Sequence, residues 1–230
     1  MTSMTDIATA YAGGRARICE LVADLAQQEA ATIVPGCPEW TVKDVVAHVT
    51  GICSDILAGN LDGVTTDPWT RAQVDARRPL PVAQIVAEWS ELGPQIEAML
   101  PSFPPEPAAQ LVGDLTTHEH DVRGALGRPG ARDSDAIAIG LEFIASNFLT
   151  NVADRELPAL SIRAGDSQWV AAGVRPVTSV SASRFEVVRA LTGRRSASQL
   201  RQLTWDGDPE PYLPAFDWGP FRVPPVDVVE

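Results

Sequence analysis

The chain is poor in histidine, cysteine and positive charge. Three histidines and three cysteines occur in 230 residues, and 18 lysines and arginines stand against 30 aspartates and glutamates, a formal net charge of −12. Binding to a nucleic-acid backbone needs clustered basic residues that neutralise phosphates and release counterions. We therefore expect no nucleic-acid partner.

Long apolar runs are also missing. No run approaches the roughly 20 apolar residues that span a bilayer, and Met1 to Ala10 lack a basic region followed by a hydrophobic stretch. Cys19, Cys37 and Cys53 are odd in number and form no CxxC pair, which argues against a disulfide framework and a zinc–thiolate site. We expect reduced thiols, no membrane association and a cytoplasmic location.

What is present is typical of folded protein. Apolar residues make up 45% and charged residues 21% of the chain, close to the averages for globular domains. Since domains commonly contain roughly 100 to 150 residues, the length accommodates one large domain or two modest ones.

Helical periodicity dominates the first two thirds of the chain. Apolar residues recur every three or four positions, the pattern of amphipathic helices, over residues 7–25, 45–56, 82–99, 111–126 and 137–152. Thr41 and Asp44 form a capping-box start for the second helix, and Gly127 ends the fourth. Residues 59–80 form a long connection with one helical turn near Arg71 to Ala76, and four prolines between 101 and 107 break the chain before Leu111. We predict an antiparallel helical bundle over residues 1–153.

The pattern changes near residue 154. Strand alternation at Leu160 to Ile162 precedes a turn at Gly165 and Asp166, and further strand follows at 169–170 and 174–180. Ser183 caps another helix, which ends at Gly193, and a short one follows. The predicted fold class is therefore α+β, with a helical bundle followed by a smaller α/β domain over residues 154–230.

His48, Asp114 and His118 are the candidate metal ligands. His48 lies on the apolar face of its helix, between Val45 and Ile52. Asp114 and His118 are four residues apart, about 40° around a helix axis, so they share a face. Facing helices of bundles commonly build metal sites, and two imidazoles with one carboxylate leave coordination positions open, as in catalytic sites.

This donor set favours Zn²⁺ and also accepts Fe²⁺, Mn²⁺, Ni²⁺ or Co²⁺. Asp121 shares the face of Asp114 and can orient a ligand imidazole. His120 lies about 200° around the helix from His118 and is expected on another surface. From pattern alone, a hydrogen-bonded core role for the inward histidines remains open.

Other catalytic patterns are weaker. No serine lies in a GxSxG context, and Gly13–Gly14 do not follow the strand–loop–helix order of phosphate-binding loops. Arg194, Arg195 and Arg201 lie near helix ends, where arginines are usually solvated, and are candidates for binding an anionic group.

The segment Val34 to His48, VPGCPEWTVKDVVAH, resembles the first metal motif of the mycothiol-dependent maleylpyruvate isomerase family, a branch of the DinB-like four-helix bundles. DLTTHEHD, from Asp114 to Asp121, resembles the second. The runs ALTGRR, from Ala190, and WDGDP, from Trp205, are similar to the family's appended C-terminal domain. One departure is Asp114, where the family typically has glutamate; the shorter side chain implies an ion that lies closer to its helix or binds more weakly.

The resemblance implies a DinB-like bundle and an enzyme whose divalent metal, Zn²⁺ foremost, binds the sulfur of mycothiol as thiol cofactor or co-substrate. The thiolate would add to a small electrophile, giving either cis–trans isomerisation or thiol S-transfer. Help from an arginine of the second domain, Arg194, Arg195 or Arg201, is implied for an anionic substrate. Since a fold family does not fix a reaction, the alternative is a non-catalytic, metal-stabilised binding or regulatory module.

Overall fold

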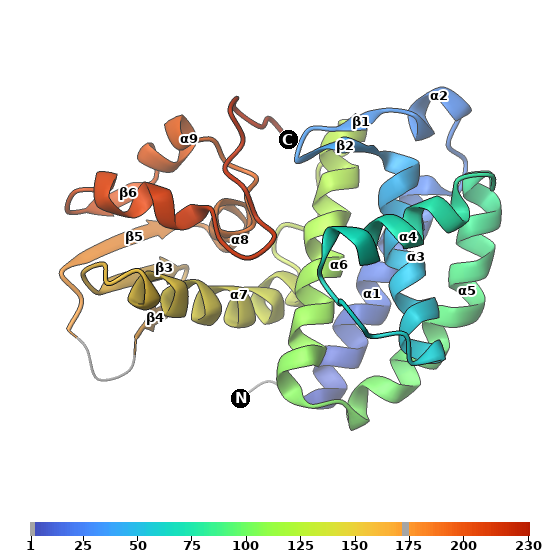
Figure 1. Cartoon of the computed structure of the whole chain (residues 1–230), viewed down its shortest axis with the longest axis horizontal. Helices are drawn as coiled ribbons and strands as arrows, with labels where there is room; N and C mark the ends of the chain where they lie inside the picture. Colours follow the sequence, from blue (N-terminus) through green and yellow to red (C-terminus); the bar gives the residue numbers. More distant parts are fainter. Residues whose placement is uncertain (1–2, 172–174) are drawn as a thin grey trace. The chain divides into compact units, whose positions relative to one another are not determined.

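The computed structural model describes residues 3–171 and 175–230 and divides into two compact units (Figure 1). The first contains residues 1–130 together with Glu230, and the second contains residues 131–229. The fold class is confirmed: a helical N-terminal part is followed by a part that contains a sheet and helices.

Four long helices form the first unit: α1 (Met4–Val22), α3 (Val42–Ala58), α5 (Val82–Met99) and α6 (Pro105–Leu126). Each packs against two of the others, α1 against α5 and α6, and α3 against the same pair. Helices α1 and α6 run in one direction and α3 and α5 in the other (Figure 1). The apolar faces predicted from the periodicity are buried between them, with Ile18, Val45, Ile85 and Val122 fully inaccessible.

Helix α6 begins earlier than predicted. We expected the prolines before Leu111 to break the chain, but Pro104 is the N-cap and Pro105 opens the helix. Proline is tolerated in a first turn because the amide hydrogens there have no partner inside the helix. Gly127 ends the helix in the left-handed conformation, with φ +61°, as its position predicted.

Shorter elements connect the long helices. A turn of helix, α2 (Gln27–Ala30), leads into a hairpin of β1 (Ile33–Val34) and β2 (Cys37–Thr41). The connection after α3 contains α4 (Asp67–Arg77), a helix of 11 residues where a single turn was expected. It packs along α3. A 3₁₀ turn, η1 (Leu100–Ser102), joins α5 to α6.

The second unit is built on α7 (Asp135–Asp154) and a four-stranded sheet. The strands are β3 (Leu160–Ala164), β4 (Ser167–Val170), β5 (Thr178–Ala182) and β6 (Thr204–Asp206), in the order β4-β3-β5-β6. Only β3 and β5 pair in parallel among the pairings described. The helices are α8 (Arg184–Leu191), α9 (Ala197–Arg201) and the 3₁₀ segment η2 (Glu210–Phe216). Ser183 caps α8 as predicted; Val174, placed in a strand by the sequence, lies outside the described residues.

The division between the units differs from the predicted boundary at 153/154. Helix α7, which the sequence assigned to the bundle, shares a core with β3, β5 and α8, in which Leu141, Phe148, Ile162 and Val188 are buried. The periodicity showed that α7 has an apolar face but carried no information about which element covers it.

Helix α7 also has the length and composition of a membrane span, with 20 residues and a mean hydropathy of 1.4 in its most apolar window. Its sequence departs in this respect from the expectation that no segment approaches such a span. The apolar face of α7 is accounted for by the core of the second unit, into which Ile137, Ile144 and Leu149 also pack.

Candidate metal centre

Helix α3 places His48 in the interior of the bundle. Its start is fixed by the predicted capping box, in which the Thr41 hydroxyl accepts from the Asp44 amide at 3.2 Å and the Asp44 carboxylate accepts from the Thr41 amide at 2.9 Å. A cap of this kind contributes about 1 kcal/mol to helix stability. Two turns into the helix, His48 is 3% exposed and lies on the buried face with Val45 and Ile52.

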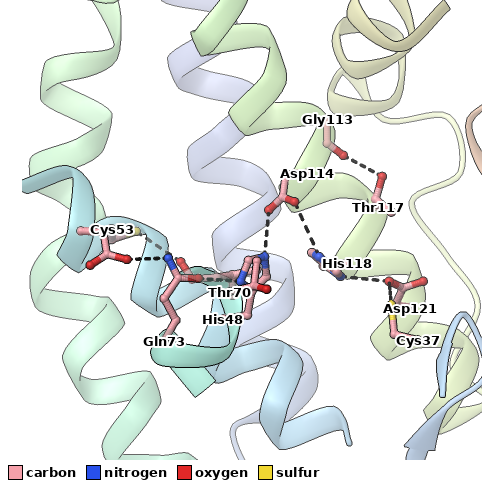
Figure 2. Close-up of polar contacts among 12 residues, drawn as sticks. Cys37, His48, Cys53, Thr70, Gln73, Gly113, Asp114, Thr117, His118 and Asp121 are labelled. Carbon is pink, nitrogen blue, oxygen red and sulfur yellow. Dashed lines mark hydrogen bonds and ion pairs between the residues drawn. The ribbon is translucent and has the colours of Figure 1, made fainter. Parts of the chain in front are cut away.

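Helix α6 brings Asp114 and His118 to the same place. Asp114 Oδ2 lies 3.7 Å from His48 Nε2, and Asp114 Oδ1 lies 3.6 Å from His118 Nε2 (Figure 2). His118 is buried, whereas the Asp114 side chain is 34% exposed. The two rings thus turn their Nε2 atoms toward one carboxylate that solvent reaches.

A side chain from α4 holds His48 from its other nitrogen. His48 Nδ1 lies 2.8 Å from Gln73 Oε1, and Gln73 Nε2 donates to Asp55 Oδ2 at 2.6 Å. Because an ionised carboxylate only accepts hydrogen bonds, the Gln73 amide must present its NH₂ to Asp55 and its oxygen to the ring. His48 Nδ1 therefore carries the proton, and Nε2 keeps its lone pair for an ion.

Gly51 permits this contact. A Cβ at position 51 would lie 2.5 Å from Gln73 Cβ and 2.7 Å from Gln73 Cγ, so only glycine lets α4 come so close to α3. The next turn of α4 is held by Arg77, which is buried, pairs with Glu88 and donates from Nη1 to the Gln73 carbonyl at 3.2 Å.

Asp121 holds the second ring in the same manner. Its Oδ2 lies 2.9 Å from His118 Nδ1, and its side chain is fully buried. The carboxylate accepts the Nδ1 proton, which again leaves Nε2 as the donor atom toward Asp114. The Cys37 thiol, on β2, donates to the same Oδ2 at 3.5 Å (Figure 2).

Trp40 covers the imidazoles. Its ring centroid lies 4.9 Å from that of His48 and 5.7 Å from that of His118, and it stacks on the latter at an interplanar angle of 28°. The β1–β2 hairpin thus supplies an apolar wall that restricts ring rotation and limits the water that reaches the nitrogens.

The donor set fits one divalent cation. One donor atom from each of His48, Asp114 and His118 lies within 4.8 Å of the others. Tetrahedral bonds of about 2.0–2.2 Å place neighbouring donors roughly 3.3–3.6 Å apart. Each imidazole Nε2 lies near that distance from one Asp114 oxygen, His48 from Oδ2 at 3.7 Å and His118 from Oδ1 at 3.6 Å. Binding of one ion through a single carboxylate oxygen therefore requires the three side chains to close by up to about 1 Å. Three protein donors leave at least one coordination position open.

The residues next to His118 are also buried. Glu119 accepts from Arg17 at 2.8 and 2.7 Å and from Arg123 at 3.0 Å, which joins α1 to α6. His120 is 2% exposed, so the expectation that it lies on a surface was wrong. Within the described part of the chain it belongs to neither possible metal-binding group.

The three arginine candidates lie in the second unit. Arg195 pairs with Glu186 through two bonds of 2.8 Å and borders a hollow of about 220 Å³. Its guanidinium lowers the pKa of Glu186. Arg201 makes an exposed ion pair with Glu210, and Arg194 is buried and donates to the Thr192 carbonyl.

Sequence reasoning missed Gln73 and Asp55 as parts of the site and set Cys37 aside as a metal ligand. Trp40 was included in the first metal motif, but no role was assigned to it. Gln73 falls on the connection of 59–80, whose length alone marked it as a segment that often carries function. Cys53 is fully buried and contacts the Tyr11 hydroxyl at 3.1 Å.

Fold and site together define a class: a four-helix bundle with two inward imidazoles and a carboxylate from two helices, followed by a smaller unit with a sheet. Residues 11–130, more than half of the chain, match the family model described as mycothiol maleylpyruvate isomerase N-terminal domain. The chain belongs to this family, as its motifs predicted.

Two solved structures share the fold. One is a crystal structure of the mycothiol-dependent maleylpyruvate isomerase, with a TM-score of 0.55 and 14% identity. The other is a mutant of that isomerase in which a histidine is replaced by alanine, with a TM-score of 0.60 and 13% identity. Both alignments cover 90% of this chain and 96% of the other. No curated protein matches the chain.

Proposed function

We propose that the protein is a metal- and mycothiol-dependent enzyme that adds a thiolate to a small electrophile. The supporting observation is the convergence of His48, Asp114 and His118, each imidazole being held through Nδ1 so that Nε2 faces the shared carboxylate. Family membership supports the thiol, and the likeness to a maleylpyruvate isomerase makes maleylpyruvate the first electrophile to test.

In this proposal His48, Asp114 and His118 hold the ion, with Zn²⁺ the best match to two nitrogens and an oxygen. When bound, a divalent cation favours thiolate over thiol and so supplies a nucleophile at neutral pH. Asp121 is the positioning residue for His118 and Gln73 for His48, because each fixes which nitrogen carries the proton. The open side of Asp114 is where the thiol and the electrophile meet.

The reaction has two outcomes that share a first step. The sulfur bonds to an electrophilic carbon of a conjugated double bond, and the π electrons move to the carbonyl oxygen. In isomerisation, rotation about the former double bond, now single, is followed by cleavage of the carbon–sulfur bond. In S-transfer, the adduct takes up a proton and leaves; with an alkyl chloride such as monochlorobimane, the carbon–sulfur bond instead forms as chloride departs.

An anionic substrate requires a cationic partner, and Arg194, Arg195 and Arg201 remain the proposed candidates. Arg201 is the easiest to recruit, because its pair with Glu210 is exposed and solvent screens the attraction between the two charges. We further propose a cytoplasmic location, which three cysteines that form no disulfide among the described residues support.

The test is metal content combined with a thiol screen. The purified protein, loaded with Zn²⁺, is incubated with mycothiol and either maleylpyruvate or monochlorobimane. We expect about one zinc per chain, thiol-dependent turnover, and loss of both in His118→Ala with the helical circular dichroism retained.

His120→Ala is the matched control, a buried histidine of α6 outside the possible metal-binding groups of the described residues, and it should keep its zinc. If the protein binds zinc but shows neither turnover nor thermal stabilisation by the thiol, the enzyme proposal is wrong and the alternative, a metal-stabilised binding module, is supported. Absence of stoichiometric zinc would overturn both.

A further inference from the structure

A second group of donor atoms adjoins the first. Cys37 Sγ on β2 lies 3.5 Å from Asp121 Oδ2, which lies 2.9 Å from His118 Nδ1 (Figure 2). One donor atom from each of the three residues lies within 4.8 Å of the others. Asp121 and His118 are buried, and Cys37 is partly exposed on the hairpin. The first group uses the opposite nitrogen of the same His118 ring.

We propose that a thiophilic divalent cation, Zn²⁺ or Cd²⁺, binds Cys37, Asp121 and His118 as an alternative to the first site. A thiolate at about 2.3 Å and a carboxylate oxygen at about 2.0 Å are separated by roughly 3.5 Å in a tetrahedral shell, which matches the spacing of Sγ and Oδ2. His118 Nδ1 and Oδ2 must separate by a few tenths of an ångström when an ion replaces their hydrogen bond. Water completes the shell from the exposed side of Cys37.

The two positions compete for one ring. A neutral imidazole has one lone pair and one N–H. Binding at the second position moves the ring proton from Nδ1 to Nε2, so that Nε2 no longer serves the site with His48 and Asp114, and the Cys37 proton passes to solvent. A soft ion held by Cys37 therefore removes a ligand from the first site, and each chain binds one ion in either position.

Softness decides between the positions. The first group offers nitrogen and oxygen only, whereas the second adds a sulfur, which soft ions prefer. Cadmium should therefore favour the second position, and hard ions such as Mn²⁺ the first. The proposal goes beyond the proposed function, since it requires no thiol co-substrate and no turnover.

Cobalt spectroscopy tests the assignment. Metal-free protein, reduced with a phosphine in place of a thiol, is titrated with Co²⁺, and the near-ultraviolet sulfur-to-cobalt charge-transfer band is recorded. In His48→Ala, which lacks the first site, one equivalent of Co²⁺ should produce the band. The band should be lost in His48→Ala/Cys37→Ser and retained in His48→Ala/Cys19→Ser, the matched cysteine control. Absence of the band in His48→Ala, or its persistence without Cys37, overturns the proposal.

A second measurement uses the wild-type chain and does not depend on how that variant folds. Alkylation of each cysteine is followed by peptide mass spectrometry with and without Cd²⁺. Cadmium should protect Cys37 and leave Cys19 unchanged, and unprotected Cys37 overturns the proposal. Failure of the proposed function, seen as zinc binding without thiol turnover, leaves both of these readouts intact.

Discussion

Replacement of Gln73 by leucine removes the hydrogen bonds that orient His48 while keeping a side chain of similar volume against Gly51. The acceptor 2.8 Å from His48 Nδ1 and the donor 2.6 Å from Asp55 are both lost. His48 is 3% exposed, so no water can replace the amide oxygen as acceptor for its Nδ1–H. Leaving a buried donor unsatisfied costs about 1–3 kcal/mol.

The same magnitude follows from metal chemistry. Loss of a group that orients a ligand imidazole typically weakens metal binding by about 10–100-fold, which corresponds to roughly 1.4–2.7 kcal/mol. We expect Gln73→Leu to weaken zinc binding within this range, because the ring becomes free to carry its proton on Nε2.

The assay is competition for Zn²⁺ with a chromophoric chelator at fixed pH. Gln84→Leu is the matched control, because Gln84 is exposed on α5 and its replacement should leave zinc affinity unchanged. If Gln73→Leu binds zinc as tightly as wild type while its helical circular dichroism is unaltered, the inference that Gln73 selects the His48 tautomer is refuted.

Three further predictions concern stability. Gly51→Ala forces a Cβ to 2.5 Å from Gln73 and should lower the free energy of unfolding by about 2 kcal/mol, or Tm by roughly 4–8 °C. Gly13→Ala is the control, because its Cβ would meet only the flexible end of Arg17, and it should cost nothing. Equal Tm values for the two variants in thermal unfolding scans would contradict the close approach of α4 to α3. Glu119→Ala leaves Arg17 and Arg123 without their buried carboxylate and should lower the free energy of unfolding in urea by about 3 kcal/mol. Glu29→Ala is the control, because Glu29 forms an exposed pair with Arg128, and it should lower the free energy of unfolding by under about 1 kcal/mol. The hydrogen bond from Arg195 lowers the pKa of Glu186 in the folded protein. The pair therefore contributes stability above the unfolded pKa of about 4.3, and this contribution is lost as pH falls through the lower folded pKa. Glu186→Gln should flatten the acid side of the curve of Tm against pH, and an unchanged curve would exclude the Glu186–Arg195 pair as a source of the acid dependence.

Much of the fold could be predicted because burial leaves a periodic trace in sequence. The faces of α1, α3 and α5 followed from apolar spacing. The start of α3 followed from Thr41 and Asp44 and the end of α6 from Gly127, whose side chains or backbone freedom act locally. The extent of α4 could not be predicted, since only Gln73, Val74 and Arg77 of its 11 residues are buried. A helix that packs mainly through polar side chains has little hydrophobic pattern.

The candidate site divides in the same way. His48, Asp114 and His118 were found because helical spacing fixes which side chains share a face, and the structure brings all three together. Their role as ligands stays a prediction. The partners of Nδ1 differ in predictability: Asp121 is one turn along the same helix, whereas Gln73 reaches His48 from a different helix through a contact that depends on the missing side chain at Gly51.

The hydrogen bonds of the two rings come from unlike sources. His118 is oriented from within its own helix by Asp121, whereas His48 depends on α4, a mostly exposed segment outside the four long helices. Sequence change in α4 can therefore alter the orientation and tautomer of His48 while the bundle core and His118 stay unchanged. Related proteins with this architecture could therefore change their ion preference by substitutions in α4, a connecting segment that contributes little to the core.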